Sequence, residues 1–147
     1  MATESAPAVR EVVNVTWFPP PPTLVKVNVD GATTKHQNIA GVGSIIWDEL
    51  GQVVAAMCRK IPVPLGPSKA EAKAFEAGLQ LARDMGFQDM ILEGDSLILV
   101  RALCGLSSPL SIIDSMVVGM QLLCSDFSYG LYFSCKEARE QTCPYFS

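Results

Sequence analysis

The chain has 147 residues, of which 49% are hydrophobic and 18% are charged, and its formal net charge is −4. This length suits one domain with a single core, and the hydrophobic content excludes an intrinsically disordered chain. No uncharged apolar run approaches the roughly 18 residues of a membrane span, and the N-terminus lacks the pattern of a secretory signal. We therefore expect a soluble intracellular protein, nuclear or cytoplasmic, with no membrane contact.

The cysteine and histidine content bears on metal and disulfide chemistry. Five cysteines are scattered along the chain, without a C-x-x-C pair and with a single histidine, His36. This pattern argues against a zinc site and against a disulfide framework. We expect reduced thiols, no disulfide partner, and a loop position for His36. The net negative charge also lacks the electrostatic footprint of a protein that binds nucleic acid through its phosphates.

The first half of the chain predicts a leader followed by three strands. Residues 1–22 read as a flexible leader that ends in the proline-rich "WFPPPP", which joins neither a helix nor a strand ladder. The alternating "VKVNVD" predicts a strand that ends at Asp30, because Asp-Gly is a turn signal. Two further strands are expected in 41–61, on either side of a turn at "DELGQ". These strands follow one another and should pair antiparallel.

The second half predicts alternating helices and strands. Ser68 should open a helix that runs to about Met85, with Gly86 ending it. A strand at 89–94, helices at about 96–103 and 110–124, and a last strand at 127–134 follow in that order. We expect an α/β domain over residues 23–135, with a mixed sheet flanked by helices, and an atypical tail without clear pattern over 136–147.

Glu71 stands on an unexpected side of its helix. At about 100° per residue the lysines and other polar residues of this helix form one narrow stripe, and Glu71 lies about 160° from its centre. This rotation points the carboxylate at the sheet. Ser68-x-x-Glu71 also matches a capping box, in which the glutamate bonds the first amide of the helix. The helix alone supports a cap and a functional site equally.

Two further acids follow predicted strands. Asp30 and Asp95 each stand where a strand gives way to the next element, and ligands of such sheets gather outside the carboxyl ends of the strands. Each also has an ordinary explanation, a turn for Asp30 and a helix start for Asp95. If the first and fourth strands are neighbours, these acids and Glu71 form a cluster that repels itself unless cations bind.

Carboxylate oxygens suit Mg²⁺ or Mn²⁺, which are hard cations. Two such ions about 3.5–4 Å apart can activate a water and stabilise the leaving oxygen of a phosphodiester. The three acids therefore indicate phosphoryl transfer to water.

Four segments carry a family resemblance: "WFPPPPTLVKVNVDGATT", "AGVGSIIWDELGQVVAA", "AEAKAFEAGLQLARDMGF" and "MILEGDSLILVRAL". In order and spacing they resemble the plant ribonuclease H-like domain of the reverse-transcriptase-associated type, a type 1 ribonuclease H, over about residues 17–133. The resemblance implies the ribonuclease H-like fold, a five-stranded mixed sheet with helices on both faces. It also implies an endonuclease that cuts the RNA strand of RNA–DNA hybrids with two Mg²⁺ or Mn²⁺ ions.

Carried over residue by residue, the resemblance places metal-binding catalytic acids at Asp30, Glu71 and Asp95. These are the same acids that the residue patterns indicate. Glu93, two residues before the end of its strand, is not expected to bind metal.

The C-terminus departs from the family pattern. The family normally ends in R-E-x-N-x-x-A-[D/H]-x-L-A, whose Asp or His completes the metal site, whereas this chain ends "SCKEAREQTCPYFS". Cys143 or Tyr145 falls near the expected place, so we expect the fourth ligand to be missing. A truncated gene or a change of reading frame near Cys135 would explain the loss. The alternative function is a catalytically impaired ribonuclease H-like module that binds nucleic acid or another protein.

Overall fold

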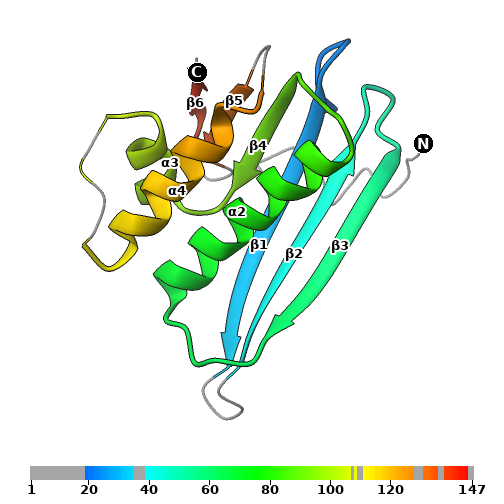
Figure 1. Ribbon diagram of the computed structural model, residues 1–147. Helices are drawn as coiled ribbons and strands as arrows, with labels where there is room; N and C mark the ends of the chain where they lie inside the picture. The colour runs from blue at the N-terminus through cyan, green and yellow to red at the C-terminus, as the bar shows by residue number, and fades with distance from the viewer. Residues whose placement is uncertain are drawn as a thin grey trace, which may run out of the picture.

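A mixed sheet with strand order β3-β2-β1-β4-β5-β6 forms the centre of the molecule (Figure 1). The computed structural model describes residues 19–34, 39–106, 108, 111–127, 131–135 and 138–145, with residues 112 and 138–145 described as backbone only. The strands are β1 (Val25–Thr34), β2 (Ile39–Trp47), β3 (Val53–Ile61), β4 (Met90–Gly94), β5 (Leu131–Cys135) and β6 (Ala138–Tyr145). Neighbours pair antiparallel from β3 to β1, parallel from β1 to β5, and antiparallel between β5 and β6.

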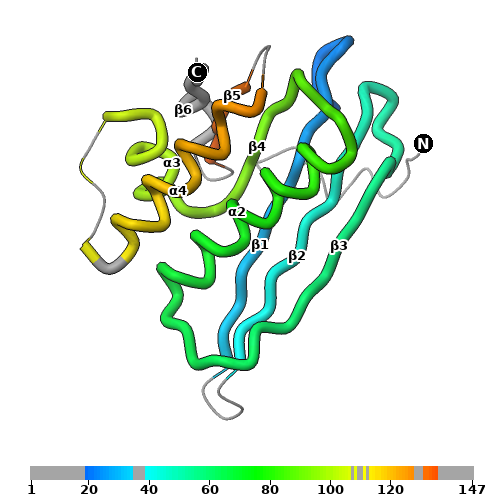
Figure 2. Tube along the Cα trace, in the orientation of Figure 1, coloured from blue at the N-terminus to red at the C-terminus, as the bar shows by residue number. Residues whose placement is uncertain are grey.

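The helices are α2 (Pro67–Asp84), α3 (Leu97–Leu103) and α4 (Asp114–Cys124), with a 3₁₀ turn, η2 (Ser111–Ile113), before α4. Figure 1 shows α2 and α4 in front of the sheet, and α2 packs mainly against β1 and β2. Figure 2 follows the chain from β3 through α2 into β4, the crossover that makes β4 parallel to β1. The predicted order of elements and the ribonuclease H-like fold class are confirmed.

Local signals in the sequence account for most element ends. In the β2–β3 turn, Asp48 Oδ1 accepts hydrogen bonds of 2.9 Å from the amides of Leu50 and Gln52. Gly51 has a positive φ there, as the "DELGQ" turn requires. Ser96 caps α3 by accepting a 3.1 Å hydrogen bond from the amide of Leu99.

The prediction that the first strand ends at Asp30 is wrong. β1 continues through Gly31 to Thr34 and stays paired with β2 along this stretch, where Asp30 faces Gly43. Gly31 does not form a turn. A Cβ at this position would collide with the backbone carbonyl oxygen of Ala70 in the first turns of α2. The glycine is therefore needed for close approach of helix and strand, a role that the Asp-Gly pattern did not indicate.

The C-terminal tail joins the sheet, although its sequence shows no clear pattern. The backbone of β6 pairs antiparallel with β5, with Tyr145 opposite Leu131 and Cys143 opposite Phe133. The five expected strands are therefore followed by a sixth at the edge. The greater part of the predicted leader (residues 1–18 of 1–22) and His36 lie outside the described residues.

The cysteines differ from expectation at one position. Cys104, at the C-terminal end of α3, is disulfide-bonded, so the prediction that no cysteine forms a disulfide is wrong. Its partner lies outside the residues whose side chains are described. Cys58, Cys124 and Cys135 are free thiols, and burial raises the pKa of the Cys124 thiol to about 12. The scattered spacing of the cysteines did not indicate this bridge.

No helix within the described part of the chain is long and apolar enough to cross a membrane.

The core lies between the sheet and α2. Val27 and Val29 of β1, Leu92 of β4, and Phe75 and Leu79 of α2 are all buried there. Gly78 of α2 sits directly over the sheet, where an added Cβ would lie 2.5 Å from Val29 Cγ1. The helix can approach the sheet this closely only because position 78 has no side chain.

We predict that Gly78→Ala lowers the free energy of unfolding by about 1–3 kcal/mol, because overpacking costs more than the gain in helix propensity. Gly119→Ala is the matched control, since Gly119 is exposed on α4 and an added Cβ meets nothing within 4 Å. This control should gain about 0.5–1 kcal/mol in urea denaturation. A stabilised Gly78→Ala variant would contradict the packing described here.

Candidate metal centre

Asp30 and Asp95 are brought together at the point where β1 and β4 separate. The parallel pairing of these strands ends with Asn28 opposite Glu93. Asp30 lies two residues further along β1, and Asp95 lies two residues further along the chain, just after β4. Beyond the last pair β1 stays paired with β2, whereas the segment that follows β4 turns toward α3. The two carboxylates therefore face a shared gap.

Glu71 enters this gap from the first turns of α2. Gly31 allows the helix to contact β1 closely, and the amide of Gly31 donates a 3.0 Å hydrogen bond to Glu71 Oε1. The predicted capping box is wrong, because α2 begins at Pro67 with Gly66 as its N-cap and has no side-chain cap. Proline at the first helical position already fits this helix start. The hydrogen bond from Gly31 thus ties Glu71 to the strand.

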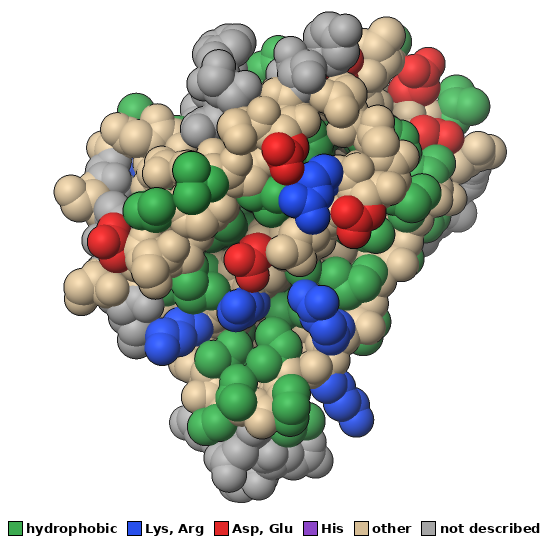
Figure 3. All heavy atoms as spheres, viewed as in Figure 1, with side chains coloured by type: hydrophobic (Ala, Val, Ile, Leu, Met, Phe, Trp, Pro, Cys, Tyr) green, Lys and Arg blue, Asp and Glu red, His purple; other side chains and the backbone are tan. Residues whose placement is uncertain are grey.

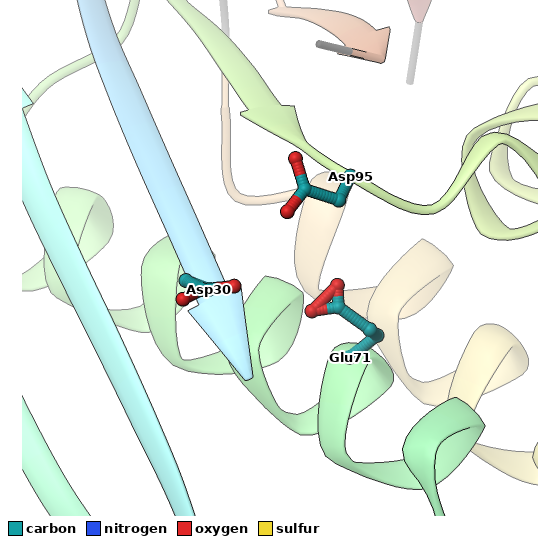
Figure 4. Close-up of side chains that lie close together, drawn as sticks. All are labelled: Asp30, Glu71 and Asp95. Carbon is teal, nitrogen blue, oxygen red and sulfur yellow. The ribbon is translucent and has the colours of Figure 1, made fainter. Parts of the chain in front are cut away.

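The three acids form one cluster. One carboxylate oxygen from each of Asp30, Glu71 and Asp95 lies within 4.8 Å of the others. Figure 4 shows the three side chains directed at a common space from β1, α2 and the end of β4. Asp30 and Asp95 are exposed and Glu71 is half-buried, so the space is open to solvent. The meeting of these three acids, expected from adjacent first and fourth strands, is confirmed.

The donor set fits a hard divalent cation. All three groups are carboxylates, which suit Mg²⁺ and Mn²⁺, and the described residues near them offer no histidine or thiolate to this cluster. Without a cation, three negative charges at such separations repel one another. The predicted fourth position near Cys143 or Tyr145 lies where side chains are not described, so its absence stays a prediction.

Glu93 has a different environment from the three acids. Its side chain accepts a 2.9 Å hydrogen bond from Asn28 Nδ2 and a 3.3 Å hydrogen bond from Ser134 Oγ. It is not a member of the acidic cluster, and the expectation that it does not bind metal stays a prediction. Sequence reasoning missed Asn28 and Ser134. The available signal was spacing, since Asn28 and Glu93 each stand two residues before a cluster acid.

The surroundings of the cluster differ on its two sides. An open cavity of about 600 Å³ adjoins Asp30 along β1, β2 and β3, and its lining is mostly apolar, with Gly43, Ile45 and Ala56 among its residues. On the face that α2 covers, Figure 3 shows most of the lysine and arginine side chains grouped below the acidic ones. Lys73 of α2 lies 3.4 Å from Glu76. Among the described residues that line the cavity, Asp30 is the only charged one.

Sequence comparison identifies the family. The profile of the family described as reverse transcriptase-like matches residues 28–136, which include most of β1, all of β2 through β5 and all three cluster acids. The chain belongs to the reverse transcriptase-like family. No curated protein matches it. Plant origin, which the sequence resemblance suggested, is not tested by this match.

This reverse transcriptase-like chain is similar in fold to solved ribonuclease H structures. RNase H1 of Halobacterium salinarum is 26% identical, with a TM-score of 0.68, covering 80% of this chain and 90% of that one. The N-terminal RNase H domain of a Mycobacterium tuberculosis protein is 23% identical, with a TM-score of 0.67 and coverages of 76% and 86%. LC11-RNase H1, solved with an RNA/DNA hybrid, is 18% identical, with a TM-score of 0.67 and coverages of 78% and 88%.

We predict that Asp95→Asn stabilises this reverse transcriptase-like domain in EDTA at low ionic strength. Removing one of three mutually repelling charges should raise the free energy of unfolding by up to about 1 kcal/mol. Asp84→Asn is the control, because Asp84 lies 3.5 Å from Arg83 Nε and loses an attraction instead. Urea denaturation measures both. Equal effects of the two substitutions would contradict repulsion within the cluster.

Proposed function

We propose that this chain is a metal-dependent endonuclease that hydrolyses the RNA strand of RNA–DNA hybrids. The observation that carries the proposal is the convergence of Asp30, Glu71 and Asp95, with oxygens within 4.8 Å of one another, in a ribonuclease H-like fold. Membership of the reverse transcriptase-like family supports it. The hybrid seen with LC11-RNase H1 supports the choice of substrate.

In this proposal the three carboxylates hold the cations and the backbone positions the carboxylates. Two Mg²⁺ or Mn²⁺ ions, when bound, would activate a water and stabilise charge on the leaving oxygen. Asp30 is fixed by its place in the β1–β2 ladder, and Glu71 by the amide of Gly31. Asp95 precedes the capped start of α3. Asp30 and Glu71 thus lie in regular elements, and Asp95 lies in the short connection between β4 and α3, which favours a preorganised site.

The negative net charge limits how substrate can be held. Phosphate contacts supply most non-specific affinity for nucleic acid, and this chain carries a formal charge of −4. Lys69 and Lys73 on the first half of α2 are the nearest cations in sequence to Glu71. We therefore propose weak hybrid binding that depends on the divalent cation.

Hydrolysis of a labelled RNA–DNA hybrid tests the proposal. We expect cleavage of the RNA strand by the full chain with Mg²⁺ or Mn²⁺, and none in EDTA. Asp30→Asn should lower the rate at least about 100-fold, because it removes a carboxylate that the cations require. Asp84→Asn, the matched control on the exposed end of α2, should retain the wild-type rate.

A wild-type rate no higher than that of Asp30→Asn would overturn the nuclease. The alternative is a non-catalytic binding module. It would be supported if the chain binds the hybrid without cleaving it, and if Asp95→Asn changes the binding affinity only by the effect of the lost negative charge. Both outcomes are read from the same variants, because binding and cleavage are measured on one labelled hybrid.

A further inference from the structure

A side-chain hydrogen bond joins β1 to β4 immediately before the acidic cluster. Asn28 Nδ2 donates to Glu93 Oε1 at 2.9 Å, and Ser134 Oγ of β5 donates to Glu93 Oε2 at 3.3 Å. The Glu93 carboxylate therefore contacts both neighbouring strands. Only 2% of Glu93 is exposed; its hydrogen bond with Ser134 is buried, and its hydrogen bond with Asn28 is part-buried.

The position of this bond in the sheet is specific. Asn28 and Glu93 form the last pair of the β1–β4 ladder, and Asp30 and Asp95 follow two residues later on either side of the gap. Beyond this pair the ladder supplies no further link between the two strands. The Asn28–Glu93 bond is thus the last described cross-link of the ladder before the two acids.

Fold stability alone does not explain a carboxylate at this place. Burial of a charged group is costly, and an apolar pair of similar volume often serves stability as well or better. A hydrogen bond, unlike an apolar contact, fixes the distance and direction between two strands. Directional control matters where strands separate, because a misplacement of about 1 Å near reacting groups costs about 100-fold in rate.

We propose that Asn28 and Glu93 are a positioning pair that sets the separation of Asp30 and Asp95 for cation binding. The proposal rests on the proposed function, since it assigns a role within the same metal site. Neither residue of the pair need touch the cation or the substrate. Their effect is transmitted along two residues of β1 and two residues at the end of β4.

Binding of Mn²⁺ to the full chain, measured by titration calorimetry, tests the pair directly. Asn28→Ala should weaken Mn²⁺ binding at least about tenfold, the effect typical of groups that orient metal ligands. Ser134→Ala is the matched control, because it removes the other hydrogen bond to Glu93 without unlinking β1 from β4. This control should bind within about twofold of wild type.

Two further variants separate position from charge and from folding. Glu93→Gln keeps an acceptor for Asn28 and should bind Mn²⁺ within about threefold of wild type. Asn28→Asp replaces the hydrogen-bond donor with a second carboxylate that repels Glu93, and it should weaken Mn²⁺ binding. Combining Asn28→Asp with Glu93→Gln exchanges donor and acceptor, and should restore binding to within about threefold. Thermal unfolding in EDTA shows whether each variant is folded.

The outcomes distinguish the pair from the site itself. Binding by wild type that is lost in Asp30→Asn but unchanged in Asn28→Ala overturns the positioning pair alone. Failure of the double variant, when folded, to recover the affinity lost in Asn28→Asp also overturns it. A wild-type chain that binds no Mn²⁺, or an Asp30→Asn variant that binds it equally well, overturns the metal centre and the pair together.

Discussion

The close contact between α2 and β1 at Gly31 is the constraint on which the candidate site depends. Because position 31 has no side chain, the backbone of Ala70 can lie against the strand, and Glu71 reaches the amide of Gly31. Gly78 permits the same approach two turns later. A helix held further away would still bury Phe75, but its first glutamate would no longer reach Asp30. The close contact at Gly31 therefore determines both the packing of α2 on the sheet and the position of Glu71 in the site.

Much of this arrangement follows from patterns in the sequence. Alternation, turn residues and helical periodicity predicted the order of the elements, and the rotation of Glu71 away from its polar stripe predicted that it faces the sheet. The cluster then followed from adjacency of the first and fourth strands. The order of the elements and the direction of Glu71 could be predicted because each signal lies within a single element. The cluster needed one further assumption, that the first and fourth strands are neighbours.

The errors arose where distant segments meet and, in one case, at the local start of α2. Asp-Gly at residues 30–31 has the composition of a turn, yet the contact with Ala70 decides the role of Gly31. Ser68 has the composition of a cap, yet α2 begins at Pro67. The pairing of β6 with β5 likewise depends on contacts between separate elements. The Asn28–Glu93 bond joins residues 65 positions apart, so their matching spacing from the cluster acids could suggest the pair but could not show the contact.

The acidic composition takes on a different meaning once the cluster is known. Three of the charges behind the net value of −4 belong to Asp30, Glu71 and Asp95. Two divalent cations bound there would bring the formal charge to zero and make the site locally attractive to a phosphodiester. The negative charge that argued against nucleic acid is thus partly the charge that would recruit the cations. Affinity for a hybrid should then follow cation occupancy more closely than the number of surface lysines.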